Sequence, residues 1–375
     1  MSPTRQKVLF ISFEYPTGKS YCGGVGQIVK QSRNALLDLG YEAYVLISAG
    51  FARRQPVKLL FPDGSIKSFM SLNKFLKEYE WYKFKYIIHH FINWTKELKT
   101  IKKRKGRRPQ IIYHFHSILR REKESGFRLL NSFLRNQERM IELADKIICP
   151  SAYEYENFAR YFPAFLEKVV LIENTIERFS LRKEMLERIK REHNIGKDDV
   201  ISLYVGRLER IKGAHIVLDQ APQILEKNKN LKLFFVGRWL EPDLYRKLLS
   251  VCRKFPHQFF YKRFLNKNEL FQYYYLSDIY INSSLSESFS LSTHESALCN
   301  TALLLNRLPV LEKFNDAALF FDVNRDDFSR KYETLIKDSR LRSKLAKRAF
   351  KITVKFMRKS RLKENFLDLL TKQRG

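Results

Sequence analysis

Short apolar runs alternate with helical segments along this chain, and this alternation limits the folds open to it more than any other feature. In the first half the expected strands and helices are Val8–Phe13, Ile28–Leu39, Ala43–Ile47, Ile111–Phe115, Phe127–Leu143, Lys146–Cys149 and Ser151–Tyr161. In the second half they are Ile201–Val205, Ala214–Leu225, Leu231–Val236, Asp243–Lys254, Phe259–Tyr261, Glu269–Tyr275, Ile279–Asn282, Thr293–Leu298 and Ala302–Leu305. Such alternation predicts parallel sheets with helices on both faces, in two doubly wound halves.

The length supports two domains. The chain has 375 residues, and a domain usually takes about 150. The charged stretch 179–199 is typical of a connecting helix and linker, which predicts a hinge near residues 174–199. Because doubly wound folds bind ligands at the carboxyl ends of their strands, we expect the binding site in a central cleft between the halves.

The composition points to an anionic partner. Lys and Arg total 70 against 40 Asp and Glu, a net charge of +30, which favours nucleic acid, an anionic membrane or phosphorylated substrates. No stretch approaches the ~20 apolar residues of a membrane span, and Val8–Phe13 is short for a signal peptide. The four cysteines show no Cys-x-x-Cys spacing, which argues against a disulfide framework or a zinc site. We therefore expect a cytosolic protein.

Two stretches concentrate the positive charge. Residues 71–108 hold twelve Lys/Arg against three Glu, interleaved with eight aromatic residues. This mixture favours a surface that contacts an anionic membrane, although a nucleic-acid groove would look similar. Residues 325–375 hold seventeen Lys/Arg against six acidic residues, for which a solvated helix face is an equal alternative.

A basic turn, Val205-Gly206-Arg207-Leu208-Glu209-Arg210-Ile211-Lys212-Gly213, lies between an expected strand and an expected helix. Arg207 and Lys212 near a helix N-terminus make a candidate diphosphate site, because amide groups and cations both favour an anion there. On its own, a basic turn after a strand is more often an ordinary surface loop.

Two carboxylates, Glu287 and Glu295, bracket the segment Ser288-Phe289-Ser290-Leu291-Ser292-Thr293-His294. Both are expected near the carboxyl end of strand Ile279–Asn282. A carboxylate accepts two hydroxyl donors at once, which suits the diols of a sugar or a ribose. The alternative is structural: Ser292-x-x-Glu295 has the spacing of a capping box, in which Glu295 serves only the helix N-terminus.

These motifs resemble the large retaining GT-B glycosyltransferases of family 4. Val205–Gly213 resembles their "VGRL…KG" phosphate motif, and Glu287–Glu295 resembles their "E-x7-E" motif. Phe13-Glu14-Tyr15-Pro16 with Gly23-Gly24-Val25-Gly26 resembles their N-terminal glycine loop, and Asn174 stands where they often carry a "PNG" turn. The resemblance runs in consistent order from about residue 7 to about 355.

The resemblance implies a fold and a division of labour. It implies two Rossmann-like domains facing a central cleft, with residues 1–178 as the acceptor domain and 179–355 as the donor domain. Residues 356–375 are then a basic C-terminal helix that packs back toward the N-terminal domain.

The resemblance also implies donor-binding roles. Arg207 and Lys212 would neutralise the donor diphosphate, and Glu295 would hold the ribose hydroxyls. The backbone amides of Phe289, Ser290 and Leu291 would bind the distal phosphate. Gly24 would allow the backbone to come close to the same phosphate, because glycine has no Cβ.

Two catalytic residues are expected. The resemblance implies that Glu287 contacts the transferred sugar and that a histidine follows the strand Ile111–Phe115, near the donor sugar. We prefer His116 to His114 because it lies nearer the strand end, although alternation puts both on one face. A hydrogen-bonded core histidine is the structural alternative. No Asp-x-Asp metal motif stands at a strand end, so we expect no metal and no cofactor besides the nucleotide-sugar donor.

The chain departs from the family pattern at several glycines. Ser290, Thr175, Asn300 and Arg238 each stand where the family usually has Gly. A Cβ at Ser290 could crowd a phosphate, but its hydroxyl could equally donate to one, so these departures leave open a divergent donor pocket or a weakened activity.

The expected function is transfer of a hexose from a UDP- or GDP-sugar to a saccharide or lipid-linked acceptor of lipopolysaccharide or cell-surface-glycan type. We expect the transfer to retain the anomeric configuration of the sugar. It should take place on the cytosolic face of the membrane, which the protein would contact through residues 71–108. The alternatives are the same fold acting on a nucleic-acid acceptor, and a non-catalytic scaffold that binds nucleotide sugars or polyanions. The donor base, the sugar, the acceptor and the oligomeric state are left open.

Overall fold

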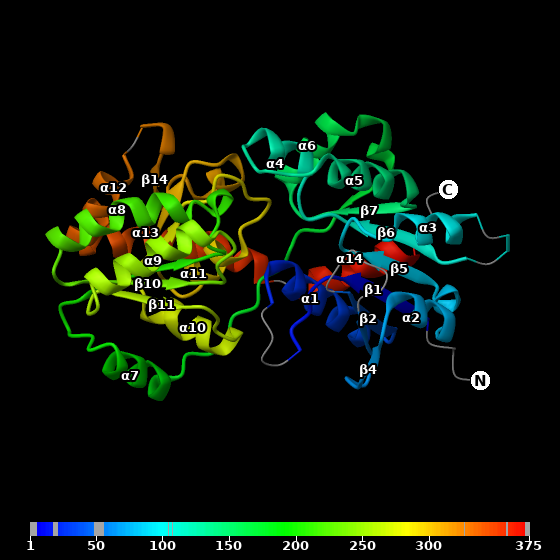
Figure 1. The fold of residues 1–375 in the computed structure, drawn as a ribbon, viewed down its shortest axis with the longest axis horizontal. Coiled ribbons are helices and arrows are strands. Elements are labelled where there is room, and N and C mark those ends of the chain that lie inside the picture. The colour runs from blue at the N-terminus through cyan, green and yellow to red at the C-terminus, as the bar shows by residue number, and fades with distance from the viewer. Residues whose placement is uncertain are drawn as a thin grey trace. The chain divides into compact units, whose positions relative to one another are not determined.

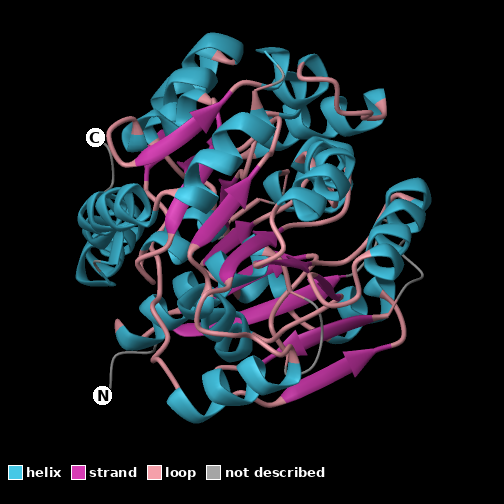
Figure 2. Cartoon of the chain, turned by 90° about the vertical axis from the view of Figure 1, so that its left-hand side faces the viewer, coloured by secondary structure: helices cyan, strands magenta, loops and turns pink. Residues whose placement is uncertain are grey.

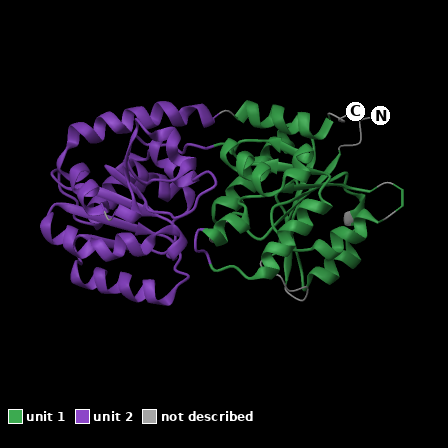
Figure 3. Cartoon of the chain, turned by 90° about the horizontal axis from the view of Figure 1, so that it is seen from above, with its two compact units in different colours: residues 1–124, 128–175, 358–375 green, residues 125–127, 176–357 purple. Residues whose placement is uncertain are grey.

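The structure is a computed structural model that describes residues 6–17, 22–48, 56–103, 105–106, 108–325, 327–357 and 359–371. It divides into two compact units (Figure 3): unit 1 comprises residues 1–124, 128–175 and 358–375, and unit 2 comprises residues 125–127 and 176–357. The expected domains end at 178 and 355, a few residues from these divisions. Parts of the expected segments lie outside the described residues: Gly18, Arg104, Arg107, Asp326, Arg358, residues 372–375 and the side chain of Trp81.

Unit 1 is built on an eight-stranded sheet in its described part, in the order β4-β3-β2-β1-β5-β6-β7-β8. The strands are β1 Lys7–Ser12, β2 Glu42–Ser48, β3 Val57–Leu60, β4 Ile66–Phe69, β5 Tyr86–His89, β6 Gln110–His114, β7 Lys146–Cys149 and β8 Val169–Leu171 (Figure 1). The helices are α1 Gly24–Asp38, α2 Leu72–Glu78, α3 Thr95–Lys102, α4 Leu119–Glu124, α5 Asn131–Leu143, α6 Ala152–Tyr161 and α14 Lys359–Thr371. The pairs β2–β3 and β3–β4 are antiparallel and the other pairs are parallel.

Helices cover both faces of this sheet, as Figure 2 shows. One apolar cluster joins Leu9 and Ile11 of β1 to α2, α3, α5 and α6. The cluster on the opposite face joins Val8 and Phe10 to α1 and to the C-terminal helix α14, whose Phe366 is fully buried. Alternate residues of β1 therefore serve two cores, which requires a continuous apolar run in the sequence.

Unit 2 has a six-stranded, entirely parallel sheet in its described part, in the order β11-β10-β9-β12-β13-β14. The strands are β9 Val200–Val205, β10 Leu231–Val236, β11 Phe259–Lys262, β12 Ile279–Asn282, β13 Ala302–Asn306 and β14 Ala318–Phe321. The helices are α7 Lys183–Glu192, α8 Ala214–Lys227, α9 Pro242–Lys254, α10 Lys267–Leu276, α11 Leu291–Ala297, α12 Phe328–Lys337 and α13 Ser339–Thr353.

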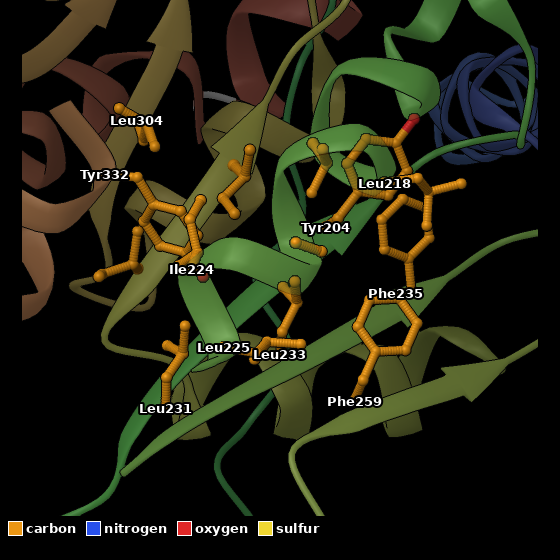
Figure 4. Close-up of a cluster of buried hydrophobic side chains, with 14 of the residues drawn as sticks. Tyr204, Leu218, Ile224, Leu225, Leu231, Leu233, Phe235, Phe259, Leu304 and Tyr332 are labelled. Atoms are coloured by element: carbon orange, nitrogen blue, oxygen red, sulfur yellow. The ribbon is translucent and has the colours of Figure 1, made fainter. Parts of the chain in front are cut away.

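The larger core of unit 2 lies between its sheet and the helices α8, α9 and α12 (Figure 4). Tyr204 and Phe235 stack in it with ring centroids 4.1 Å apart. Phe234 points to the opposite face and packs on Tyr273 of α10. The two-sided sheet that the alternation predicted is therefore confirmed in both units.

The aromatic residues of 71–108 mostly point into unit 1 rather than outward. Phe75 and Phe84 are almost fully buried, and Tyr79 and Trp94 pack against the same apolar core. Tyr86 is buried in the core on the opposite face of the sheet. The composition of this stretch suggested an aromatic surface, but these rings instead build the cores over β1 and β5. Within the described ranges, no helix is long and apolar enough to cross a bilayer.

Candidate active site

The candidate donor site lies at the carboxyl edge of the unit 2 sheet, where the strand order reverses. β9 pairs with β10 on one side and with β12 on the other, so the loops that follow β9 and β12 leave the same edge next to each other. Such a switch point is where doubly wound sheets bind their ligands. The basic turn follows β9, and the segment of Glu287 follows β12.

The turn after β9 is drawn against the β12 loop by Gly213. Its φ is +66°, and a Cβ there would stand 1.7 Å from the carbonyl oxygen of Ser283. Only glycine permits both the left-handed backbone and this close approach. The Ser283 hydroxyl donates to the Gly213 carbonyl at 2.8 Å, and buried Tyr204 donates to the Lys212 carbonyl at 2.9 Å. The turn is therefore held from two sides.

The two basic residues of the turn that were predicted to bind the diphosphate, Arg207 and Lys212, are near carboxylates. Lys212 Nζ lies 2.9 Å from Glu287 Oε1, which also accepts a hydrogen bond from the Ser284 hydroxyl at 2.7 Å. Arg207 Nη2 lies 2.7 Å from Glu209 Oε1, and its side chain remains 44% exposed against 6% for Glu209. Two cations thus project at this edge with their orientation set by hydrogen bonds.

Glu295 is held by side chains from α10 rather than by the start of its own helix. Its Oε1 pairs with Lys267 Nζ, and its Oε2 accepts from the Tyr274 hydroxyl at 3.3 Å. The helix α11 begins at Leu291 with Ser290 as N-cap, and no side chain caps it. The capping box proposed for Ser292 and Glu295 is therefore absent, and Ser292 instead accepts a hydrogen bond from Tyr280.

Ser290 adopts a left-handed backbone conformation, which favours glycine. Its φ is +64°, and its hydroxyl lies 2.8 Å from both Asn282 Nδ2 and Thr293 Oγ1. Asn282 also donates to Thr293 at 2.9 Å. These contacts turn the Ser290 side chain inward, so the Cβ is accommodated without changing the turn. Asn300, at another lost glycine, is also left-handed, with φ +58°.

The predicted phosphate-binding amides lie on this turn. Among the described contacts, the amides of Phe289 and Ser290 donate no hydrogen bond, and Leu291 begins α11. The Phe289 ring is buried and stacks on His294 at 4.4 Å, while Lys313 lies 5.0 Å from its centroid. Burial lowers the pKa of His294 to about 3, so that imidazole is neutral.

In unit 1 the glycine loop after β1 is organised around Glu14. The Gly23 amide donates to Glu14 Oε2 and the Gly26 amide to Glu14 Oε1, both at 2.9 Å. A Cβ at Gly23 would lie 2.9 Å from Glu14 Oε1, so that position needs glycine to admit the carboxylate. Gly24 is exposed and begins α1. The motif contained Glu14, but sequence reasoning assigned it no role.

Three histidines gather where β5 and β6 end. His90 Nδ1 lies 3.0 Å from His116 Nε2. The His114 ring stacks on His116 with a centroid distance of 4.8 Å and is tilted against His90 at 4.7 Å. His114 is the last residue of β6, whereas His116 lies beyond the strand and is half-buried. His89, the residue before His90, points to the other face of the sheet, where its ring centroid lies 6.4 Å from that of Trp94, and its Nδ1 accepts from the Phe91 amide at 3.1 Å.

These imidazoles are neutral in the folded chain. Burial lowers the pKa of His89 and of His116 to about 3. Burial, followed by repulsion from neighbouring imidazoles, lowers the pKa of His90 and His114 well below the usual value. Within the described residues, both nitrogens of His114 and the Nε2 atoms of His89 and His90 have no hydrogen-bond partner. His90 is a partner of His116 that sequence reasoning missed, because its role depends on which strands are neighbours.

No arrangement suited to a metal ion occurs in the part of the chain that the structure describes. No group of three or more His, Cys, Asp or Glu side chains there is placed to hold one.

Known proteins resemble the chain in sequence. A family model described as "Glycosyltransferase Family 4" matches residues 22–178, and one described as "Glycosyl transferases group 1" matches residues 186–352. A D-inositol 3-phosphate glycosyltransferase of Thermobifida fusca is 26% identical over 194 residues, covering 47% of this chain and 42% of that protein. A lipopolysaccharide 1,2-N-acetylglucosaminetransferase of Salmonella typhimurium is 21% identical over 176 residues, covering 45% and 46%. The match therefore spans about half the length of these relatives.

Solved structures share the fold over nearly the whole chain. Sucrose-phosphate synthase from Thermosynechococcus elongatus has a TM-score of 0.75 at 16% identity, covering 97% of this chain and 98% of that one. Anabaena HepE, solved in complex with UDP-glucose, has a TM-score of 0.72 at 16% identity, covering 98% and 100%. The fold is GT-B, and with its two family matches the chain belongs to the group 1, or family 4, glycosyltransferases.

Proposed function

We propose that the chain is a retaining, metal-independent hexosyltransferase that moves a hexose from a UDP- or GDP-sugar to a saccharide or lipid-linked acceptor. The observation that carries the proposal is the meeting of Arg207, Lys212 and Glu287 at the β9–β12 switch point. Two cations there suit a diphosphate. Glu295, on the helix that follows the same loop, suits ribose hydroxyls.

Arg207 and Lys212 act on the leaving group. The bond between the anomeric carbon and the diphosphate oxygen breaks with its electron pair on the diphosphate, and the two cations stabilise the charge that develops. The acceptor oxygen bonds to the face that the diphosphate leaves, and its proton passes to the departing diphosphate. No metal is needed in this scheme, since the chain supplies the countercharge.

Glu287 and His116 are the proposed catalytic residues. When a donor binds, Lys212 exchanges part of its contact with Glu287 for the diphosphate, which leaves that carboxylate to accept hydroxyls of the hexose. A neutral imidazole at His116 suits a hydroxyl group, because one ring nitrogen donates and the other accepts. The amides of Phe289, Ser290 and Leu291, with Gly24, are proposed to meet the distal phosphate. The Gly23 and Gly26 amides are already used by Glu14.

The names of the relatives support the substrate classes. HepE was solved with UDP-glucose, which supports a nucleotide-sugar donor. One relative is named for lipopolysaccharide and another for inositol phosphate, which supports a saccharide or phosphorylated acceptor. We place the reaction on the cytosolic face of a membrane. The basic residues of 71–108 that remain exposed, such as Lys77, Lys99 and Lys103, are proposed to face its anionic lipids.

The donor site is tested by thermal unfolding with UDP-, GDP- and ADP-sugars, with and without a chelator. A ligand at about 100 times its Kd adds about 2.7 kcal/mol to the free energy of unfolding. We expect one nucleotide class to shift the Tm, and Arg207→Ala and Glu295→Ala to abolish the shift. Arg210→Ala is the matched control, since Arg210 lies in the same turn but pairs with Glu241 and Asp243.

The outcomes separate the proposals. A shift that Arg210→Ala removes as completely as Arg207→Ala would show that only the charge of the turn matters. The absence of any shift in the unmodified protein would refute donor binding. For the chemical step, Glu287→Gln should lower kcat at unchanged Kd for the donor, and loss of donor binding in that variant would contradict a catalytic role.

A further inference from the structure

The helix α13 carries a row of basic residues along one face. Its sequence Ser339–Thr353 contains six Lys/Arg and no Asp or Glu. Five of them are exposed and lie at intervals of four, three, one and three residues: Arg340, Lys344, Lys347, Arg348 and Lys351. On an α-helix these positions fall within about 100° of arc and extend over about 16 Å. We call these five residues the α13 basic stripe.

The opposite face of α13 fixes the stripe in place. Leu345, Ala346, Ala349 and Thr353 are buried, and the helix packs on β13, β14, α11 and α12 (Figure 1). The sixth basic residue, Arg342, turns toward the protein and donates to the carbonyls of Leu335 and Ile336 at 2.6 and 2.8 Å. The stripe is thus the outward face of a helix that unit 2 holds rigidly.

The stripe brings together on one helix five exposed cations, none of which pairs with a carboxylate among the described residues. Within the described residues, Arg340, Lys344, Lys347 and Lys351 pair with no carboxylate, and Arg348 donates only to the Asp316 carbonyl at 3.0 Å. On the other helices of unit 2, several cations are paired with carboxylates: Arg188–Glu192, Lys190–Glu187, Lys227–Glu333, Lys247–Asp219 and Lys254–Glu226. Among the described residues Arg191, Arg246 and Arg253 are also exposed without a carboxylate partner, but they do not form a row of five on one helix.

The 71–108 stretch is also partly neutralised. Lys74 pairs with Glu78, and both Lys102 and Arg108 pair with Asp145. The stripe is therefore a concentrated, uncompensated positive charge for which the fold itself supplies no anion.

A flat anionic surface fits the stripe better than a nucleic acid does. Its side chains are only long cations in a straight row, which suits a plane of lipid phosphates. Single-stranded nucleic acid is held by exposed rings on which bases stack. The one aromatic residue of α13, Phe350, is half-buried, and the Arg178 guanidinium lies 5.7 Å from its centroid.

We infer that the α13 basic stripe is a surface through which unit 2 contacts an anionic lipid bilayer. This deepens the proposed transfer to a membrane-bound acceptor, on which it rests, and adds a contact separate from residues 71–108. Each basic side chain near an anionic bilayer stabilises the bound state by about 1 kcal/mol, which raises the partition coefficient onto the vesicle about fivefold. Since not all five touch lipid at once, neutralising the stripe should weaken binding about a hundredfold.

The experiment measures co-sedimentation of the full chain with phosphatidylcholine vesicles that contain or lack phosphatidylglycerol. The stripe variant changes all five residues to Gln. The control variant changes Arg188, Lys190, Lys227, Lys247 and Lys254 to Gln, which removes the same number of charges from paired positions of the same unit. A third variant, with Lys344→Gln, Lys347→Gln and Lys351→Gln, leaves the Arg348 contact intact in case the first is unstable.

We expect the unmodified chain to bind the phosphatidylglycerol vesicles, the stripe variants to lose this binding, and the control variant to keep it within about threefold. Equal losses in stripe and control variants would show that net charge alone acts and would overturn the inference. So would stripe variants that keep vesicle binding but lose binding to a DNA or RNA oligonucleotide.

The donor-induced Tm shift is recorded for every variant. If vesicle binding depends on the stripe while no nucleotide sugar shifts the unmodified protein, the glycosyltransferase proposal fails and the lipid contact stands. If the donor shifts the Tm of every variant normally while the stripe variants bind vesicles as well as the unmodified chain, the glycosyltransferase proposal stands and the lipid contact fails.

Discussion

The carboxyl edges of the two sheets carry opposite kinds of chemistry although they occupy the same place in two related folds. At the β9–β12 edge of unit 2, every group of the proposed donor site that bears a charge has a partner of opposite sign, as Lys212 has in Glu287. At the β1–β5–β6 edge of unit 1, four imidazoles are neutral. The first edge suits a ligand that brings its own charge, and the second suits hydroxyl groups.

Under the proposed function, the difference assigns the leaving diphosphate to one edge and sugar hydroxyls to the other. A diphosphate needs cations that are already desolvated and oriented, and carboxylates keep those cations in place before the ligand arrives. A hydroxyl nucleophile or an exocyclic hydroxyl needs donors and acceptors without net charge. Each of the following predictions disturbs one edge and uses a matched position elsewhere.

The largest expected effect is at Gly213. Gly213→Ala places a Cβ against the Ser283 carbonyl at a φ of +66°, and should lower the free energy of unfolding of unit 2 by about 3 kcal/mol or more. Thermal unfolding followed by calorimetry measures this loss. Gly196→Ala is the control, since its nearest contact is Asp199 Oδ2 at 3.6 Å. Similar stability of the two variants would contradict the close approach of the β9 and β12 loops.

The next effect concerns the charge at the donor edge. Lys212→Met should lower kcat by about 10²–10³-fold, because one cation facing the developing negative charge is lost. Steady-state kinetics with the donor found by thermal shift gives the value. Lys190→Met removes a lysine that pairs with Glu187 at 2.8 Å on the surface helix α7, and it should leave kcat unchanged. A small effect of Lys212→Met would mean that the edge is a structural ion pair.

The third effect is a pH dependence confined to the histidine edge. His114 is neutral when folded because burial lowers its pKa, whereas the unfolded chain takes up a proton near pH 6.5. The unfolded state thus binds more protons below that pH, and stability falls as the pH falls, by about 1.4 kcal/mol per pH unit for this group. His114→Leu should therefore show a flatter loss of stability from pH 6.5 to 5.

Urea unfolding at several pH values measures that slope. Glu154, whose pKa burial raises to about 8, works in the opposite direction, but it contributes equally to both proteins and cancels in the difference. His257→Gln, at an exposed position, should leave the slope unchanged. A slope for His114→Leu equal to that of the unmodified protein would mean that His114 is charged in the folded state.

The smallest effect is at Ser290. Ser290→Gly and Ser290→Ala both lose the contacts to Asn282 and Thr293, but only glycine relieves the left-handed backbone. The glycine variant should therefore unfold with a free energy about 1 kcal/mol higher than the alanine variant. Denaturant titration of the two purified variants compares them directly. Equal stabilities would show that the turn relaxes out of this conformation.

The central strands could be predicted from the sequence almost to the residue. Leu231–Val236 and Ile279–Asn282 match β10 and β12 because strands buried on both faces need unbroken apolar runs. The antiparallel strands β3 and β4 were missed, since they are short and β4 is largely exposed. β5 was read as part of a basic surface, because composition does not tell which side of a segment faces the core.

The candidate site could be predicted in its residue types but not in its contacts. Lys212 and Glu287 lie 75 positions apart in the chain, and only the order of the strands makes them neighbours. The same holds for Glu295 with Lys267 and Tyr274, which belong to another helix. Glu14 lay within a recognised motif, but the fact that it occupies two loop amides depends on the path of the chain after β1.

The contacts of Ser290 have a consequence for the evolution of this turn. A serine in left-handed backbone is tolerated here while Asn282 and Thr293 hold its hydroxyl. A relative with serine at this position is therefore expected to keep hydrogen-bonding side chains at the other two. Across relatives, the three positions should change as a set, and chains that keep glycine should show free variation at the other two.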